Sequence, residues 1–437
     1  MTRREWLLSF SAALGARGRA ATPTLEEAAL GSKEKLILHS PRPLDLETPP
    51  EMLDSWITPV SRFFVRSHFY LPQVEAASWT LSIDGLVEKP YKLTLAQLSR
   101  MPQIERVVTM ECAGNGRSYF RPRVAGIQWR KGAVGTARWK GVRLGDVLKR
   151  ASLQAEARHV AFDGADTAMA TAPDFVRSVP LEKCLHPDTL IATHMNGAPL
   201  PVAHGFPARV ITPGWEGAAS VKWVTKMTAV PAEHDGFFMK TAYRYPTRPV
   251  APGEAVDAKD LAALTSLTVK SLITRSGGPV QGLAWAGEAD IVKVEVSLDA
   301  GQTWREAALG SEKAPFAWRR FRLEGRPAAG VAMSRATDSQ GRIQPTTPAW
   351  NPSGYLYNIP DSAPEKPDLV PSALPAGQGL ALAKEKCLPC HDHTLIVGQK
   401  LDPGRWTREV EKMMRWGTPL SEAEKQTLVK YLAETFR

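Results

Sequence analysis

The sequence that decides the fold is Glu-Cys-Ala-Gly-Asn-Gly-Arg at residues 111–117, followed at residues 126–129 by Gly-Ile-Gln-Trp. Cys112 stands alone in this glycine-containing segment, which is typical of a loop. An isolated cysteine is usually a small buried hydrophobic residue. The loop setting argues against that ordinary role for Cys112, whereas Cys184, which lacks such a setting, is expected to be structural.

The other two cysteines belong to a second motif. Cys387-Leu388-Pro389-Cys390-His391 has the C-x-x-C-H spacing of c-type haem attachment. Two thiols one helical turn apart can add to the two vinyl groups of one haem, and the adjacent imidazole can reach the iron. A zinc knuckle would need a second cysteine pair, and a thioredoxin-like redox pair would need a βαβ pattern. The motif therefore favours haem c on Cys387 and Cys390, with His391 as an iron ligand.

A methionine on the following helix is the candidate for the sixth iron ligand. Met413 and Met414 both lie there, and for either one core packing is the commoner role. The segment from Trp406 to Gly417 resembles small c-type domains in which the first methionine is the ligand. We therefore expect Met413, with Met414 as the alternative.

Length, charge and hydropathy restrict the classes of protein. At 437 residues the chain is long enough for two to four domains. Its net charge of +10 is spread along the chain without a basic run interleaved with aromatic residues, so we expect no nucleic-acid binding. No stretch approaches the roughly 20 apolar residues that span a bilayer, so no membrane span is expected.

The N-terminus predicts export. Arg3 and Arg4 precede a short apolar run that ends at Gly15, and residues 1–22 resemble a twin-arginine export signal. The run is short, and Arg17 and Arg19 interrupt the expected cleavage region, so a basic frayed terminus is the alternative. Covalent haem c is attached outside the bacterial cytoplasm, and the two motifs together predict a periplasmic protein.

The chain divides into four parts after residue 22. Apolar strand-like runs and Gly- and Pro-rich loops predict an α+β domain over residues 23–249. Alternation then predicts an Ig-like β-sandwich over residues 250–358, with one buried face formed by Val292, Val294, Val296 and Leu298. A similar strand is predicted to begin at Leu267 and Val269, with turns at residues 299–301 and 338–341.

The C-terminal part is predicted to be a small helical domain behind a linker. Prolines at 360, 364, 367, 371 and 375 predict a semi-rigid linker over residues 359–376. Residues 377–437 have helical periodicity and form the expected all-α cytochrome c-like domain. Its last helix should begin at Ser421, since Glu424 completes a capping box, and should bury a stripe formed by Leu428, Tyr431, Leu432 and Phe436.

Four segments in order carry a family resemblance over residues 50–355. They are Phe-Phe-Val-Arg-Ser-His at 63–68, the Cys112 segment with Trp129, Met-Asn-Gly-Ala-Pro-Leu-Pro at 195–201 followed by His-Gly-Phe-Pro-Ala-Arg at 204–209, and Ser-Val-Lys-Trp at 220–223. Together they resemble the sulfite oxidase family of molybdopterin enzymes, in the sulfite dehydrogenase type with a c-type cytochrome domain fused at the C-terminus. The resemblance implies a Mo-molybdopterin cofactor with Cys112 as the thiolate ligand of molybdenum.

The resemblance also implies the other site residues. The positions that match the family's cofactor-binding residues are Phe64, Val65, Arg66, Ser67, His68, Cys112, Asp166, His204, Arg209, Ser220, Val221 and Lys222. The positions that match its substrate-binding and catalytic residues are Arg66, Cys112, Arg117, Trp129 and Tyr243. For Tyr243 the alternative is a surface aromatic near a domain boundary.

Two departures from the family pattern concern the substrate. Ser67 stands where many members have Asn, and Ser353 stands where the family has an arginine that faces the substrate. The loss of that cation puts the substrate's affinity and identity in question, and Arg244 is a candidate to replace it.

The resemblance implies oxidation of sulfite to sulfate, with electrons leaving through the haem to a soluble c-type cytochrome. A homodimer is implied by the second domain. Two alternatives stay open, namely another molybdenum oxidoreductase of this fold, such as a nitrate or S-oxide reductase, and an electron-transfer protein whose pterin domain is a relic.

Overall fold

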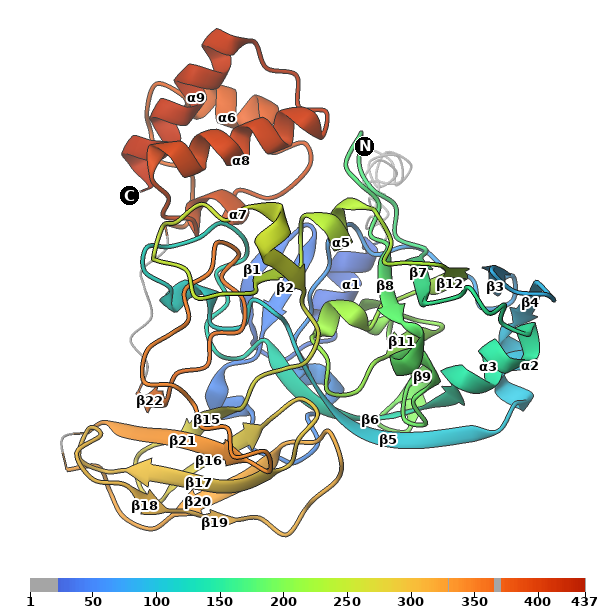
Figure 1. The fold of residues 1–437 in the computed structure, drawn as a ribbon. Helices are drawn as coiled ribbons and strands as arrows, with labels where there is room; N and C mark the ends of the chain where they lie inside the picture. Colours follow the sequence, from blue (N-terminus) through green and yellow to red (C-terminus); the bar gives the residue numbers. More distant parts are fainter. Residues whose placement is uncertain (1–22, 329, 365–370, 437) are drawn as a thin grey trace, which may run out of the picture.

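The computed structural model describes residues 23–328, 330–364 and 371–436, and the predicted export signal at 1–22 lies outside these residues. Three parts follow one another along the chain (Figure 1). We call them the catalytic domain (residues 23–249), the sandwich domain (250–363) and the helical module (371–436).

The catalytic domain is built on two five-stranded sheets. One has the strand order β10-β9-β6-β5 with β11 also paired to β9, and the other has the order β4-β3-β12-β7-β8. In the second sheet β12 pairs with β3 in parallel and with β7 antiparallel. The strands are β1 (Ile37–Pro41), β2 (Leu44–Glu47), β3 (Thr80–Gly85), β4 (Tyr91–Thr94), β5 (Gln103–Glu111), β6 (Val134–Arg143), β7 (His159–Gly164), β8 (Arg177–Pro180), β9 (Leu190–Met195), β10 (Ala198–Pro199), β11 (Arg209–Ile211), β12 (Val224–Val230) and β13 (Arg244–Pro246).

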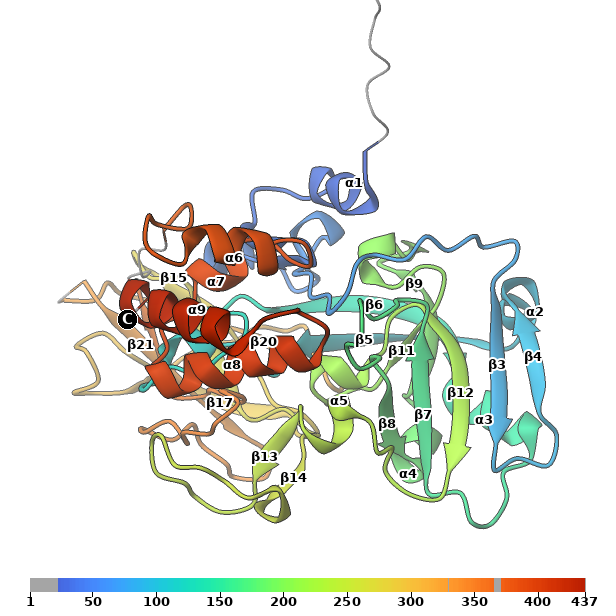
Figure 2. The ribbon, with the colours of Figure 1, turned by 90° about the horizontal axis from the view of Figure 1, so that it is seen from above.

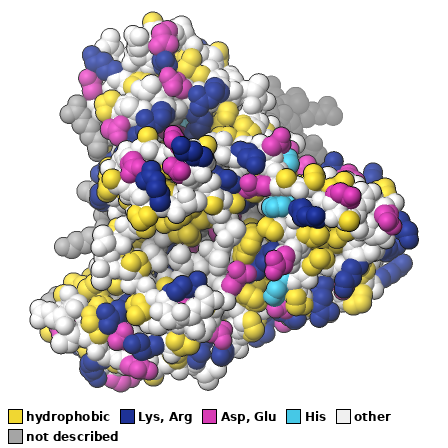
Figure 3. Space-filling model, in the orientation of Figure 1, with side chains coloured by type: hydrophobic (Ala, Val, Ile, Leu, Met, Phe, Trp, Pro, Cys, Tyr) yellow, Lys and Arg dark blue, Asp and Glu magenta, His cyan; other side chains and the backbone are white. Residues whose placement is uncertain are grey.

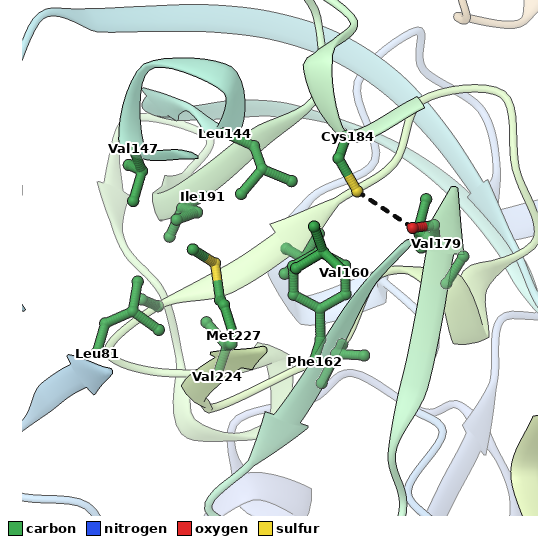
Figure 4. Packing of buried hydrophobic residues seen from close by; sticks show 14 of the residues in the cluster. Leu81, Leu144, Val147, Val160, Phe162, Val179, Cys184, Ile191, Val224 and Met227 are labelled. Atoms are coloured by element: carbon green, nitrogen blue, oxygen red, sulfur yellow. Dashed lines mark hydrogen bonds between the residues drawn. The ribbon is translucent and has the colours of Figure 1, made fainter. Parts of the chain in front are cut away.

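Short helices cover the ends of these sheets. They are α1 (Leu25–Gly31), α2 (Leu95–Arg100), α3 (Leu144–Ala151), α4 (Leu181–Leu185) and α5 (Phe237–Lys240). Helix α3 presents Leu144, Val147 and Leu148 to the core and charged residues to solvent. In that core Cys184 is fully buried and its Sγ lies 3.5 Å from the carbonyl oxygen of Val179 (Figure 4). Cys184 is therefore a structural residue, as its setting in the sequence indicated.

The sandwich domain has two four-stranded sheets, with the orders β15-β16-β20-β19 and β18-β17-β21-β22. Their strands are β15 (Lys270–Arg275), β16 (Val280–Trp285), β17 (Ile291–Ser297), β18 (Arg305–Glu306), β19 (Ala308–Leu309), β20 (Arg319–Leu323), β21 (Ala332–Asp338) and β22 (Asp361–Ala363), while β14 (Leu261–Ala263) pairs with β13. Strand β22 extends the sandwich past residue 358, into the segment expected to be a linker.

Two sequence predictions for the sandwich domain are wrong in detail. Val292 is 52% exposed, whereas Val294 and Val296 are fully buried. A register shift between Ile291 and Lys293, opposite β21, adds a residue and turns Val292 to the solvent face. The strand predicted to begin at Leu267 begins instead at Lys270, because the backbone groups of Leu267 bond to Gly214 and Gly287, which lie outside the strands.

The helical module contains α6 (Leu380–Lys386), α7 (Thr394–Val397), α8 (Pro403–Arg415) and α9 (Glu422–Thr435). The predicted capping box is confirmed, since the Ser421 hydroxyl accepts from the Glu424 amide and the Glu424 carboxylate accepts from the Ser421 amide. The predicted stripe from Leu428 to Phe436 is also buried. Figures 1 and 2 both place the module beside the catalytic domain, with α7 next to β1. Among the described residues, no helix is both long and apolar enough to cross a bilayer.

Candidate active site

A cavity lies in the catalytic domain, where loops from both sheets converge. Most of the sequence-predicted site residues line it, although they come from segments that are far apart in the sequence. These lining residues are Phe64, Arg66, His68, Cys112, Asp166, His204, Arg209, Ser220, Val221, Lys222 and Tyr243. The loops that follow β2, β5, β10 and β11 therefore bring together the four segments of the family resemblance, and the segments after β7 and α5 add Asp166 and Tyr243.

The Cys112 thiol lies in the cavity wall just after the end of β5. The loop behind it is closed by backbone hydrogen bonds, in which Asn115 N donates to Cys112 O over 2.9 Å and Arg117 N donates to Gly114 O over 2.9 Å. Gly116 has a φ of +94°, and a Cβ there would lie 2.7 Å from the Tyr357 side chain. Burial raises the pKa of the Cys112 thiol, and the guanidinium groups of Arg117 and Arg66 oppose that rise.

Arg117 is a buried cation behind Cys112, although it does not itself line the cavity. Its side chain is held by backbone carbonyls, since Nε donates to Ser353 O over 3.1 Å and Nη1 donates to Ile127 O over 3.0 Å. A Cβ at Gly114 or Gly126 would lie 2.6 or 2.8 Å from the guanidinium. The glycines of the sequence motif are therefore required for Arg117 to pack beneath the thiol loop.

A cluster of buried cations occupies one end of the cavity. Arg209 donates to the backbone oxygens of His204 (3.0 Å) and Ser220 (2.8 Å), and burial lowers its pKa to about 9. Lys222 donates to Ser67 Oγ over 3.0 Å, and burial, reinforced by Arg209, lowers its pKa well below 10.5. These side chains carry positive charge into a region where a charged group is poorly solvated.

Lys33 is a third member of this cluster, and sequence reasoning missed it. Its Nζ lies 2.7 Å from His204 Nε2 and donates to the carbonyl oxygens of Val60 (2.5 Å) and Phe63 (3.1 Å). Burial lowers the pKa of Lys33 to about 7. No local pattern marks this lysine, which follows α1 in an otherwise ordinary polar segment.

Burial lowers the pKa of both histidines of the site. Burial, followed by Arg66, lowers the pKa of His68 well below 6.5. For His204, burial lowers the pKa well below 6.5 and Lys33 is the next cause. The hydroxyl of Tyr243 lies 2.8 Å from His68 Nε2, and the Tyr243 ring stacks on Tyr355 at 5.6 Å. Tyr243 is thus buried in the cavity wall and is not a surface aromatic.

The remaining predicted residues have different placements. Burial raises the pKa of Asp166 to about 6, against the opposing charge of Lys222. Val65 and Ser67 do not line the cavity, because Val65 is bridged to Leu46 and the Ser67 amide donates to Asp45. Trp129 is also outside the lining and fully buried, and its Nε1 has no partner among the described residues.

The cation cluster fits the pterin group that the family resemblance implies. Molybdopterin carries a phosphate, and a phosphate needs converging cations and hydrogen-bond donors. Within the described part of the chain, Lys33, Arg209 and Lys222 have no carboxylate within ion-pair distance, and Arg209 Nε is buried without any partner. A bound anion would supply the missing counter-charge, and Cys112 would supply a soft sulfur ligand for molybdenum.

The sandwich domain contributes a clamp behind Cys112 that the sequence did not reveal. The Glu111 carboxylate accepts from Lys270 Nζ at 2.7 Å, from Trp285 Nε1 at 2.7 Å and from Asn115 Nδ2 at 2.8 Å. Lys270 and Trp285 belong to β15 and β16. The position of the thiol loop therefore depends on residues of both domains.

The expected replacement for the missing arginine is not found at Arg244. Its Nη1 pairs with Glu233 at 2.7 Å and its Nη2 donates to Leu261 O, which directs the guanidinium away from the cavity. Ser353 contributes only its backbone oxygen, which accepts from Arg117. The cations that lower the pKa of the Cys112 thiol are Arg117 and Arg66.

The C-x-x-C-H motif lies in the loop between α6 and α7. Both thiols are free and half-buried, and Cys387, Leu388 and Met414 pack against the hydrophobic cluster of the module. Met413, like Met414, is half-buried. Trp406 Nε1 is buried without a partner among the described residues. Two free thiols and an adjacent imidazole are the groups that covalent haem attachment uses.

Comparison with known proteins agrees with this site. The family described as "Oxidoreductase molybdopterin binding domain" matches residues 68–238, and "Mo-co oxidoreductase dimerisation domain" matches residues 264–359. The fold and the site therefore define a molybdopterin oxidoreductase.

Relatives that match most of the chain identify the family of molybdopterin oxidoreductases to which it belongs. The chain is 38% identical to sulfite oxidase of Gallus gallus over 350 residues, which is 74% of this chain and 76% of that protein. It is 31% identical to a nitrate reductase [NADH] of Brassica napus, with 72% of this chain and 39% of that one covered. The crystal structure of the sulfane dehydrogenase SoxCD from Paracoccus pantotrophus matches with a TM-score of 0.66 and 28% identity, over 82% of this chain and 93% of that one. The chain belongs to the sulfite oxidase family. It spans 64% of the length of the human mitochondrial sulfite oxidase, to which it is 38% identical.

Proposed function

We propose that this enzyme oxidises sulfite to sulfate and passes the electrons through a haem c in its helical module to a soluble c-type cytochrome. The main observation that supports an anionic substrate concerns Arg117. Arg117 is only 7% exposed, has no carboxylate partner among the described residues, and acts on the charge of the Cys112 thiol. A small anion beside Cys112 would complete that buried charge.

The molybdenum–pterin group, when bound, supplies two-electron redox chemistry and the oxygen atom that sulfite gains. The residues of this chain prepare the site for that chemistry. Arg209 and Lys222 in the cavity lining would hold the pterin's anionic end, with Lys33 beside His204 adding positive charge, and Cys112 as a thiolate would ligate the metal. Because the thiol's pKa is raised by burial, metal binding has to displace its proton.

The substrate end of the cavity would bind and neutralise the oxyanion. Arg66 reaches this end while its Nη1 stays paired to Asp45 at 3.3 Å. The hydroxyl of Tyr243 lies 2.8 Å from His68 Nε2. When His68 Nε2 donates to this hydroxyl, the Tyr243 proton is free to be donated to an oxyanion oxygen. Buried donors of this kind stabilise charge more strongly than water-exposed ones.

The helical module supports the proposed route for electrons. Cys387 and Cys390 would bind haem c through thioether bonds, His391 would be one iron ligand, and Met413 on α8 would be the other. The external acceptor would meet the outer face of this module, where Lys and Arg side chains alternate with Asp and Glu (Figure 3).

Location and assembly follow from the same proposal. Covalent haem and the Arg3-Arg4 motif support export to the periplasm in the folded state, with the cofactors in place. The match to a dimerisation domain supports a homodimer formed through residues 264–359.

The test is reduction of the haem by sulfite. Purified protein with one molybdenum and one haem per chain is mixed with sulfite without oxygen, and the haem absorbance is followed. We expect the ferrous spectrum, and its absence in fully loaded protein would refute the proposal. In a second arm, sulfane sulfur compounds replace sulfite, because the structural neighbour is a sulfane dehydrogenase. This arm shows which of the two kinds of compound reduces the haem.

A second candidate is a nitrate reductase, because such enzymes are among the relatives. It predicts oxidation of a chemically reduced haem by nitrate. Ser353 in place of an arginine is the specific difference that keeps this candidate open. Consumption of nitrate without any haem reduction by sulfite would favour it.

A further inference from the structure

The helical module contacts the catalytic domain through its C-x-x-C-H loop. The hydroxyl of Tyr70 donates to Cys390 O over 3.2 Å, and the amide of Asp392 donates to Arg42 O over 3.1 Å. Arg42 Nη2 also reaches Leu388 O at 3.5 Å. All three contacts are made by backbone groups of the loop, so the catalytic domain recognises the loop's path and not its side chains.

The segment that makes the first contact also forms the cavity wall. Phe64, Arg66 and His68 line the cavity, and Tyr70 follows His68 by two residues. A path from the cavity to Cys390 therefore consists of covalent bonds and one hydrogen bond of 3.2 Å. Cys390 is itself one of the two thiols that would be bonded to the haem.

A second chain of contacts starts from the same histidine and ends elsewhere. The ring of Phe238 lies 5.0 Å from that of His68, Phe237 lies 5.2 Å from Phe238, and Trp416 lies 5.4 Å from Phe237. These distances join ring centroids, and Phe237 and Phe238 are neighbours in the chain, so the route crosses two gaps without a bond. It ends at the C-terminus of α8, beside Met413 and Met414.

We propose that Tyr70 is the relay residue through which electrons leave the molybdenum site for the haem. This inference rests on the proposed function. Sulfite and water give sulfate, two protons and two electrons. The electrons cross one at a time, each reducing ferric haem to ferrous haem, and a one-electron carrier outside the chain reoxidises the haem between the two transfers.

The hydrogen bond of Tyr70 has two consequences for this transfer. It shortens the route by replacing a van der Waals gap, and it holds the haem-bearing loop against the wall of the cavity. Trp416 carries only the longer aromatic route. The two routes can therefore be separated by one substitution in each.

The experiment compares Tyr70→Phe with Tyr91→Phe and Trp416→Leu in fully loaded protein. Tyr91 is a matched control, because its hydroxyl donates to Val147 O over 2.8 Å in the core of the catalytic domain, away from the module. Haem reduction is measured by anaerobic stopped-flow mixing over a range of sulfite concentrations. Amide hydrogen exchange of residues 387–393 and the haem midpoint potential are measured on the same proteins.

We expect Tyr70→Phe to lower the limiting rate of haem reduction by about fivefold. Loss of one hydrogen bond shifts the equilibrium that holds the loop against the cavity wall by about this factor. The sulfite concentration for half-maximal rate and the haem potential should not change, and the amides of residues 387–393 should exchange faster. Tyr91→Phe should match the wild type in all these measurements.

Three results are decisive in the other direction. Haem reduction at the wild-type rate in Tyr70→Phe overturns this inference and leaves the proposed function standing. A larger loss in Trp416→Leu than in Tyr70→Phe assigns the exit to the aromatic route and also overturns it. Failure of loaded wild-type protein to reduce its haem overturns the proposed function itself, and this inference with it.

Discussion

Replacing Lys270 with Met tests whether the sandwich domain holds the thiol loop in place. The Lys270 and Glu111 side chains are 9% and 6% exposed, and their charged atoms are 2.7 Å apart. Without the lysine, the Glu111 carboxylate stays buried with only the Asn115 and Trp285 donors. Removing one partner of a buried ion pair typically costs about 3–5 kcal/mol, and we expect a loss of that size.

The size of the loss distinguishes an uncompensated charge from ordinary packing. The double variant Lys270→Met with Glu111→Gln removes both charges, so it should lose less, roughly 1–3 kcal/mol, from weakened hydrogen bonds. Lys259→Met is the exposed control, since Lys259 and Asp257 are both 78% exposed, and it should change stability by less than about 0.5 kcal/mol.

The assay is urea unfolding followed by tryptophan fluorescence, with molybdenum content measured on the same samples. Because Glu111 adjoins Cys112, Lys270→Met should also lower the molybdenum content, whereas Lys259→Met should not. A loss below about 1 kcal/mol in Lys270→Met, or a double variant as unstable as the single one, would refute the reasoning.

Three further predictions concern the cavity. Burial lowers the pKa of Lys33 to about 7, so between pH 7 and 10.5 the folded lysine loses a proton that the unfolded one keeps. Cofactor-free protein should therefore become more stable as pH rises through this range, by up to about 1.4 kcal/mol per pH unit. Lys33→Met should remove that slope in urea unfolding at pH 7 and 9. Arg209→Met should bind the cofactor at least about tenfold more weakly, measured as pterin and molybdenum per chain, with Arg248→Met, an exposed arginine, as the unaffected control. Tyr243→Phe should lower kcat/KM for sulfite by about tenfold through loss of one charge-assisted donor while cofactor content stays unchanged, and an unchanged kcat/KM would exclude a role for its hydroxyl.

Features encoded within a few residues could be predicted from the sequence. The capping box at Ser421 involves atoms three residues apart, and it starts α9 as expected. The cavity-lining residues were found through motifs in four segments, because each motif carries its own glycines and charged residues. Gly114 and Gly126, for example, are where Arg117 packs.

Features that depend on contacts distant in sequence could not be predicted. Lys270 and Glu111 are 159 positions apart, and although Glu111 begins the Cys112 motif, no motif contains Lys270. Lys33 reaches His204 across 171 positions. Val292 continued a regular alternation, and only the pairing of β17 with β21 introduces the bulge that exposes it. In each case the partner that determines the outcome lies in a segment distant in the sequence or on a neighbouring strand.

The docking of the helical module has a kinetic consequence. Module and catalytic domain belong to one chain, so their encounter is unimolecular and each experiences the other at an effective concentration on the order of millimolar. Dilution of the protein cannot slow that encounter. In the proposed function, the steps whose rates depend on concentration are the binding of substrate and the meeting with the next carrier.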